Sequence, residues 1–332
     1  MSITAFFKQY LLRKQQRKLY LALQDILQTN LGNLLSQDPQ EILPTAPLNI
    51  ALKRMIERGN SFLLVLDKNK PLGILREKAF LEERAFNKNF LNLPVKSCME
   101  PVPPILANEA TLHEAMESAV QHQHTETLVR LPNNNLGVVS LQAIAERIDR
   151  HYNDLIENID ILPKVKDFTF APAIWVDYDT PLLQARRLLL TSPSGSLLVR
   201  PPDDFILKGI ITERDFISEF YKYGAEFSRF LCKNIMNSPV VTIRPETDIF
   251  EANRVMLKQG FRRLPVTETN RYLGIITPLQ LFDCLIKTYH QFTRKQITSQ
   301  ARPQGKQKPG KEAKKNKAPR KPSREKTNAK NS

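Results

Sequence analysis

The sequence contains an internal duplication, and this constrains the fold more than any other feature. Residues 99–148 align without a gap on residues 236–285 at an offset of 137. The region from Pro47 aligns on the region from Pro181 at an offset of 134. Self-similarity at a fixed spacing is the signature of repeated structural units. The chain is therefore predicted to consist of four units in the order A-B-A′-B′.

Each unit is predicted to contain short strands and two helices. The fourth unit shows the pattern best, with segments that alternate between strand and helix patterns and end at turn residues. Its expected elements are a strand at 240–243, a helix at 249–259, a strand at 263–266, a strand at 272–277 and a helix from Pro278. A unit of about 55 to 60 residues is too small to bury its own sheet, so the units should pair.

The stretch Gly209–Asp215, which reads Gly-Ile-Ile-Thr-Glu-Arg-Asp, is the most informative copy of a repeated motif. A glycine and two aliphatic residues predict a buried strand, and Thr212 is suited to cap a following helix. Asp215 then lies in the first turn of that helix. Oxygen ligands beside free backbone N–H groups form a geometry suited to a ribose and its phosphate.

These motifs resemble those of the cystathionine β-synthase (CBS) domain family. The resemblance rests on Met236-Asn237, on Gly260–Val266, which reads Gly-Phe-Arg-Arg-Leu-Pro-Val, and on the Gly-x-x-Thr-x-x-Asp pattern. It covers roughly residues 34–290. It implies an α/β (α+β) fold of four CBS modules that form two Bateman pairs, at 34–150 and 161–290. In that family, clefts of the pairs bind AMP, ADP, ATP or S-adenosylmethionine, and the pair regulates another protein.

The resemblance also implies a set of ligand residues in the second pair. Thr212 and Asp215 match the family's hydroxyl and ribose-binding carboxylate, and Arg262 and Arg263 stand where the family directs a cation at phosphate. The residues expected to line the adenine slot come from the two first strands of this pair: Ile174, Val176, Val241 and Thr242.

The other clefts depart from this pattern. Thr277 keeps the hydroxyl, but Gln280 replaces the aspartate, which makes this second cleft a weaker candidate. In the first pair the positions of Thr212 and Asp215 are taken by Arg76 and Ala79, and no ribose carboxylate remains. We expect the first pair to bind no nucleotide or something different, and to serve as a packing or docking surface.

No combination of residues with catalytic or metal-ligand spacing is apparent. His122 and His124 are two residues apart and do not share a helix face, so no metal site is expected there. Because no Ser/His/Asp or Cys/His combination with suitable spacing appears, the chain is not expected to be an enzyme. The three cysteines are predicted to be buried, reduced thiols. No apolar run approaches the roughly 20 residues of a membrane span, and the N-terminus lacks a signal-peptide core. The expectation is a cytoplasmic protein with no required cofactor.

Both termini carry positive charge outside the repeats. Residues 294–332 contain 14 Lys or Arg and two Glu, so most of the formal net charge of +15 lies there. With few aliphatic residues and no aromatic residue, this tail is predicted to be disordered and to bind RNA or DNA, anionic lipid or an acidic protein. A purely solubilising tail is the alternative.

Residues 1–33 are predicted to contain a basic amphipathic helix with apolar positions at Phe7, Leu11, Tyr20, Leu23 and Leu27. It would pack on the modules or on a second copy of the chain, as in a homodimer. Docking to a membrane surface or a partner helix is the alternative.

Two classes of function follow. One is a non-enzymatic regulatory protein that binds an adenosine-type ligand in its second pair and thereby modulates a partner. The other is a structural adaptor in which the pairs are a scaffold and the tail binds nucleic acid or an acidic partner.

Overall fold

The computed structural model describes residues 3–300, except 37–39, 87–88, 125, 157–158, 169, 203, 205 and 270. The chain divides into two units, Met1–Thr293 and Arg294–Ser332. Most of the predicted tail, 301–332, lies outside the described residues. The last helix ends at Gln300, a few residues inside the segment 294–332 that was predicted as the tail.

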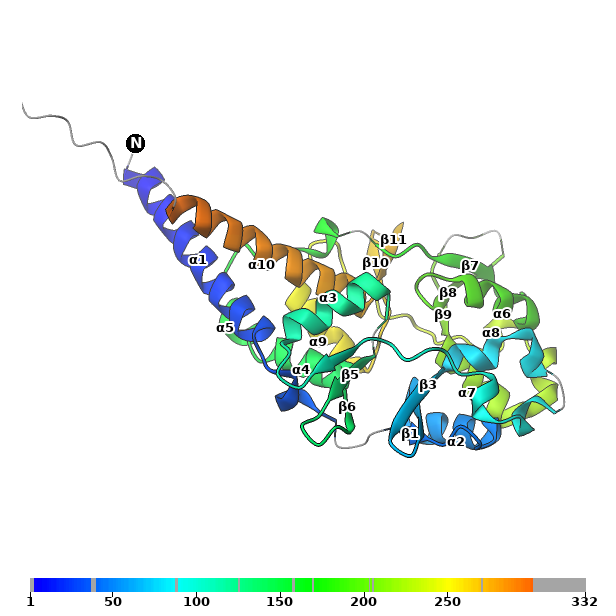
Figure 1. The fold of residues 1–332 in the computed structure, drawn as a ribbon. Helices are drawn as coiled ribbons and strands as arrows, with labels where there is room; N and C mark the ends of the chain where they lie inside the picture. The colour runs from blue at the N-terminus through cyan, green and yellow to red at the C-terminus, as the bar shows by residue number, and fades with distance from the viewer. Residues whose placement is uncertain are drawn as a thin grey trace, which may run out of the picture. The chain divides into compact units, whose positions relative to one another are not determined.

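The first unit contains four modules built from short strands and helices (Figure 1). The elements of module 1 are β1 (Glu41–Ile42), α2 (Leu48–Arg58), β2 (Phe62–Asp67), β3 (Lys70–Arg76) and the 3-10 helix η2 (Glu77–Leu81). Those of module 2 are β4 (Ile105–Ala107), α3 (Leu112–His122), β5 (Thr127–Arg130), β6 (Leu136–Val139), α4 (Leu141–Asp149) and α5 (Tyr152–Ile156).

The remaining two modules repeat this order. The elements of module 3 are β7 (Ile174–Asp177), α6 (Leu182–Thr191), β8 (Ser196–Arg200), β9 (Gly209–Thr212), α7 (Glu213–Tyr223) and α8 (Cys232–Ile235). Those of module 4 are α9 (Ile249–Gln259), β10 (Leu264–Glu268), β11 (Arg271–Ile276) and α10 (Pro278–Gln300). Helix α1 (Ile3–Leu27) precedes them all, and the other 3-10 helices are Leu31–Leu34, Glu83–Phe86, Phe90–Asn92, Val95–Ser97, Val165–Asp167 and Gly224–Arg229.

The sheets of modules 1 to 3 have the same topology: the first strand is parallel to the second, and the third is antiparallel to the second. Module 4 differs, because the strand predicted at 240–243 is reduced to a single parallel bridge between Ile243 and Val266. Extending this ladder to Val241 would require a backbone N–H from Pro265, which proline lacks. The segment before Ile243 therefore leaves the sheet.

Modules pack in pairs through their sheets. Leu64 and Ile74 of module 1 are buried in one cluster with Leu128 and Val138 of module 2. Between modules 3 and 4, the ring of Trp175 packs edge-to-face on that of Tyr272 with 5.3 Å between centroids. Trp175 is thus a packed aromatic residue at the interface of the second pair.

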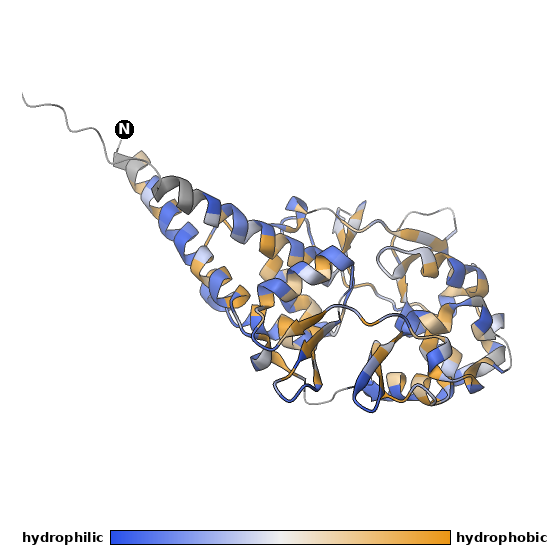
Figure 2. Cartoon of the chain, in the orientation of Figure 1, coloured by the Kyte–Doolittle hydropathy of each residue, from blue (hydrophilic) through white to orange (hydrophobic). Residues whose placement is uncertain are grey.

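The two pairs stack through their helices. One cluster of buried side chains joins module 1 to module 3, and another joins module 2 to module 4. Helix α4 lies against α9, and α7 lies against η2 and α2. Figure 2 shows hydrophobic residues on helix and strand faces that are turned toward neighbouring elements. The predicted α+β class with tandem modules in two pairs is confirmed.

Helix α1 packs on the modules along its C-terminal half. Leu19, Leu23, Ile26 and Leu27 are fully buried in the cluster of modules 2 and 4. Helices α1 and α10 run side by side (Figure 1), and the rings of Tyr20 and Tyr289 stack 5.6 Å apart. The predicted apolar face was wrong for Phe7 and Leu11, which are exposed, because the N-terminal half of α1 extends beyond the sheets of the modules.

The predictions about cysteines and membrane spans can also be compared with the described residues. Cys98, Cys232 and Cys284 are free and buried, as predicted. Among the described residues, no helix combines the length and the apolar character needed to cross a membrane.

Candidate functional site

A pocket of about 490 Å³ lies between modules 3 and 4 and reaches module 1. Five of the predicted ligand residues line it: Thr212, Asp215, Val241, Arg262 and Arg263. The other lining residues come from the end of α2, from η2, β9 and α7, from the segment before Ile243, and from the end of α9 to the start of β10: Ile56, Gly59, Glu77, Ile210, Arg214, Asn237, Pro239, Val240, Gln259, Gly260, Phe261 and Pro265.

The polar side of the pocket is the N-terminus of α7. Thr212 is the N-cap of this helix, and Asp215 closes a capping box with it. The backbone N–H and the hydroxyl of Thr212 both donate to Asp215 Oδ2, each at 2.7 Å. The side-chain amide of Asn237 donates to Asp215 Oδ1 at 2.7 Å. Oδ2 thus accepts two hydrogen bonds and Oδ1 accepts one, so Asp215 is held in place while Oδ1 keeps a free lone pair that can accept from a ligand.

The apolar side is the segment that leaves the sheet of module 4. Pro239, Val240 and Val241 line the pocket there, and Val241 is partly exposed toward it. Thr242 points elsewhere, because its hydroxyl oxygen accepts a hydrogen bond from Thr267 at 3.0 Å. The loss of regular pairing at Pro265 thus gives the pocket its apolar wall.

Two arginines stand at the opposite end. Arg263 reaches back to module 3, where its Nε donates to the Ser194 carbonyl at 2.8 Å and its Nη2 lies 3.5 Å from Glu213 Oε2. Gly195 has a φ of +61°, and a Cβ there would stand 2.3 Å from this guanidinium, so glycine permits the approach. Arg262 makes no hydrogen bond or ion pair with any residue that the structure describes, and burial lowers its pKa.

Glu77 is a buried carboxylate beside these arginines. It begins η2 of module 1, and its Oε1 lies 2.5 Å from Arg214 Nη2. Arg214 also donates to the carbonyls of Met55 and Asn60, at 2.7 and 2.6 Å. Burial raises the pKa of Glu77 to about 7, although Arg214 and Arg262 oppose this shift. One wall of the pocket therefore changes charge near neutral pH.

The raised pKa of Glu77 predicts that stability falls as pH rises. The native protein binds a proton at Glu77 between the ordinary pKa of 4.5 and about 7, whereas the unfolded chain does not. Between pH 5.5 and pH 8 this should cost about 2 kcal/mol of unfolding free energy. Glu77→Gln should remove this part of the pH dependence, and urea unfolding at the two pH values measures it.

A matched control for this experiment is Glu57→Gln, which changes an exposed carboxylate on α2. It should leave the pH dependence of wild type unchanged. Arg214 keeps its two carbonyl acceptors in Glu77→Gln, so the variant should fold. A Glu77→Gln protein with the full wild-type pH dependence would show that another group is responsible.

The weaker cleft repeats the capping geometry without a carboxylate. Gln280 Oε1 accepts from the backbone N–H and the hydroxyl of Thr277, at 2.9 and 2.5 Å. Thr277 lines a separate cavity of about 340 Å³ with Arg262 and Arg263, whereas Gln280 does not.

Of the residues predicted to line the adenine slot, Val176 is buried in the core of modules 1 and 3, and Ile174 packs against that core. The structure does not bring these two residues to Thr212 and Asp215.

The corresponding position of the first pair is filled by an ion-pair network. Arg76, at the position of Thr212, donates from Nε and Nη2 to the two oxygens of Glu126 at 3.0 and 3.1 Å. It also contacts Glu100, which aligns with Asn237. Ala79 is buried where Asp215 would stand. A bidentate arginine between two carboxylates agrees with the expectation that this cleft takes no ribose phosphate.

Sequence reasoning missed Asn237, Glu77 and Arg214. Asn237 could have been found, since it follows Met236 in the quoted motif and begins the segment that forms the apolar wall. Glu77 and Arg214 come from different pairs, and no local pattern indicates that they meet.

Comparisons with known proteins agree with this architecture. The CBS domain family profile matches residues 31–85, 165–222 and 232–287. Protein MK0525 of Methanopyrus kandleri is 33% identical over 91 residues, 26% of this chain and 46% of that protein. CBSX3, a mitochondrial CBS domain-containing protein of Arabidopsis thaliana, is 26% identical over 107 residues, 31% of this chain and 52% of that protein. The chain thus spans about half the length of these curated relatives.

Solved structures share the fold over most of the first unit. Protein MJ1225 of Methanocaldococcus jannaschii, a suggested archaeal homologue of g-AMPK, has a TM-score of 0.65 at 21% identity, covering 77% of this chain and 99% of that one. A conserved protein of Pyrococcus horikoshii has a TM-score of 0.54 at 19% identity, covering 77% and 100%. The matched segments amount to more than half of the sequence, and the module missed by the profile, module 2, has the same strand and helix order. The chain belongs to the CBS domain family.

Proposed function

We propose that the protein is a non-enzymatic regulatory protein that binds an adenosine phosphate in the pocket between modules 3 and 4. The observation that carries this proposal is the convergence of Thr212, Asp215, Val241, Arg262 and Arg263 on one pocket of about 490 Å³. That volume lies within the range of about 300 to 1,000 Å³ that is usual for small-molecule sites.

The chemistry of the walls orients the ligand. The adenine ring would lie against Pro239, Val240 and Val241, and a ribose hydroxyl would donate to Asp215 Oδ1. The phosphate would then lie between the N-terminus of α7 and Arg262. Helix N-termini favour anions, and the half-buried Arg262 guanidinium, which has no hydrogen-bond partner among the described residues, would gain charge-assisted hydrogen bonds to phosphate oxygens.

The same charges favour a phosphate over a sulfonium. S-adenosylmethionine carries a cationic sulfur at the position that the phosphate of AMP would take. In this pocket that sulfur would face Arg262, with Arg263 and Arg214 nearby, so like charges would oppose binding. AMP, ADP or ATP is therefore the preferred ligand class of this proposal.

Ligand binding would act on the arrangement of the modules. The pocket is lined by Ile56, Gly59 and Glu77 of the first pair as well as by residues of the second pair. A ligand that contacts both pairs binds best to one relative arrangement and shifts the population toward it. A partner that recognises that arrangement would be the regulated protein.

A thermal-shift and calorimetry panel tests this proposal, with AMP, ADP, ATP, S-adenosylmethionine and cyclic dinucleotides on the full chain. A phosphate ligand should raise the melting temperature, because it binds the native state selectively. S-adenosylmethionine should not. If no nucleotide binds, the adaptor function gains support, and salt-dependent binding of RNA or DNA to residues 294–332 becomes the measurement of interest.

A further inference from the structure

Three side chains with metal-binding atoms meet between α3 and α10, and none of them lines the proposed nucleotide pocket. They are His113, Glu117 and His290, and their ligand atoms all lie within 4.8 Å of one another. His113 is largely buried, and the other two are partly exposed. Because 177 positions separate the two histidines, only the fold brings them together.

Helix α3 presents two of these groups on one face. Thr111 caps α3 and forms a capping box with Glu114, which fixes the first turn that carries His113. His113 and Glu117 are four residues apart, the spacing that places two helix side chains next to each other. Glu117 Oε2 lies 3.6 Å from His113 Nδ1.

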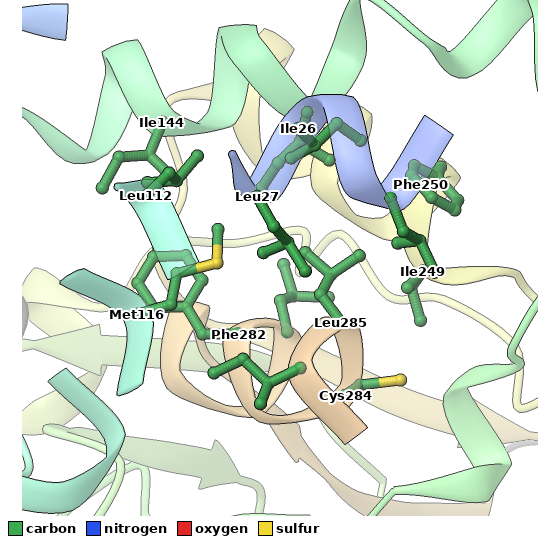
Figure 3. Packing of buried hydrophobic residues seen from close by; sticks show 14 of the residues in the cluster. Ile26, Leu27, Leu112, Met116, Ile144, Ile249, Phe250, Phe282, Cys284 and Leu285 are labelled. Atoms are coloured by element: carbon green, nitrogen blue, oxygen red, sulfur yellow. The ribbon is translucent and has the colours of Figure 1, made fainter. Parts of the chain in front are cut away.

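The third group is held in place by the core of modules 2 and 4. Figure 3 shows Met116 of α3 and Phe282 and Leu285 of α10 in the same group of buried side chains, and all three belong to one cluster. Above this cluster, the ring of Tyr289 contacts that of His113 with 5.9 Å between centroids. The position of the neighbouring His290 relative to α3 is therefore fixed by packing.

The distances fit a tetrahedral metal ion. The Nε2 atoms of His113 and His290 are 3.2 Å apart. Two nitrogens that each lie about 2.0–2.1 Å from a zinc ion at a tetrahedral angle are separated by about 3.3 Å. Glu117 Oε1 lies 3.9 Å from His290 Nε2, so a small rotation of this partly exposed side chain would bring it to the same ion.

We propose that His113, Glu117 and His290 form a binding site for a divalent transition-metal ion, with zinc as the reference. Two imidazoles and one carboxylate are a donor set that zinc accepts, and the exposed side leaves the fourth position to water. The bound ion would tie α10 to α3 and thus to module 2. The hard cations Mg²⁺ and Ca²⁺ prefer oxygen ligands and should not compete.

Another pair of histidines serves as the internal control. The rings of His122 and His124 lie 6.0 Å apart at the end of α3, and these two histidines belong to no group of three metal-binding side chains among the described residues. His122→Ala removes one histidine, as His290→Ala does, but from the other pair. His122 is exposed and His290 is partly exposed, so neither His122→Ala nor His290→Ala should prevent folding.

Zinc titration by calorimetry on the tag-free full chain tests the site, with the absorption spectrum of bound Co²⁺ as a second readout. Wild type should bind one ion per chain. His290→Ala should weaken binding by roughly 100-fold or more, and Glu117→Gln by at least about tenfold, whereas His122→Ala should match wild type.

Two results would overturn the proposal. One is the absence of zinc binding and of a Co²⁺ spectrum in folded wild-type protein. The other is equal zinc affinity in wild type and His290→Ala, with or without a loss in His122→Ala. Melting temperatures without metal establish that each variant is folded.

Discussion

Replacing Asp215 with alanine is expected to weaken the binding of an adenosine phosphate by about 30- to 150-fold. The variant would lose a hydrogen bond from a ribose hydroxyl to the charged Oδ1 of Asp215, worth about 2 to 3 kcal/mol. Asp215 is already oriented by Thr212 and Asn237, so little ordering cost accompanies binding. Calorimetric titration of wild type and Asp215→Ala with whichever nucleotide binds best measures the difference.

The same substitution removes a capping box, so its effect on stability needs a matched control. Glu114→Ala removes the equivalent capping box of α3, in which Thr111 donates to Glu114 at 2.7 and 2.9 Å. Each variant should lose about 0.5 to 2 kcal/mol of unfolding free energy. Only Asp215→Ala should lose ligand affinity. Equal affinities in wild type and Asp215→Ala would leave Asp215 as a helix cap and would contradict the proposed ribose contact.

The parts of the site that the sequence predicted are those within one local motif. Thr212 and Asp215 lie three residues apart on a strand end and a helix start, so their meeting follows from helix geometry. The interpretation of the adenine slot was less successful because it depends on how whole strands are placed. Val241 reaches the pocket because Pro265 ends the hydrogen-bonded pairing with β10. Val176 lies in a fully paired strand, and its side chain is buried in the core.

Contacts between different modules could not be read from the sequence at all. Both contacts join the two pairs: Glu77 of module 1 meets Arg214 of module 3, and His113 of module 2 meets His290 of module 4. Each of these residues alone is compatible with an exposed position. Their roles arise from packing, where burial shifts the pKa of Glu77 and a shared core fixes the spacing of the two imidazoles.

The N-terminal helix left a choice that the structure decides for part of its length. The periodic apolar residues of 1–33 are compatible with packing on the modules, on a second copy or on a membrane surface. Leu19 to Leu27 supplies buried side chains to the core of modules 2 and 4, so this half of α1 is a structural part of the first unit. Phe7, Tyr10 and Leu11, in the N-terminal half of α1, are exposed and add no side chains to this core.

Replacing Leu27 with alanine is expected to lower the unfolding free energy by about 2 to 5 kcal/mol, the largest stability effect expected here. Leu27 is fully buried, and Figure 3 shows its side chain near that of Leu285 of α10 in the same cluster. The smaller side chain loses apolar burial and leaves a cavity that the surrounding helices cannot fill without moving. Urea or thermal unfolding of the full chain measures the change.

Leu21→Ala is the matched control, since it makes the same chemical change on the same helix at a position that is 51% exposed. A substitution on the surface should alter the unfolding free energy by less than about 0.5 kcal/mol. Helix propensity favours alanine slightly over leucine in both variants, so this contribution cancels in the comparison. Equal stabilities of the two variants would contradict the packing of α1 on modules 2 and 4. A loss confined to Leu27→Ala would show that the modules and the N-terminal helix fold as one unit.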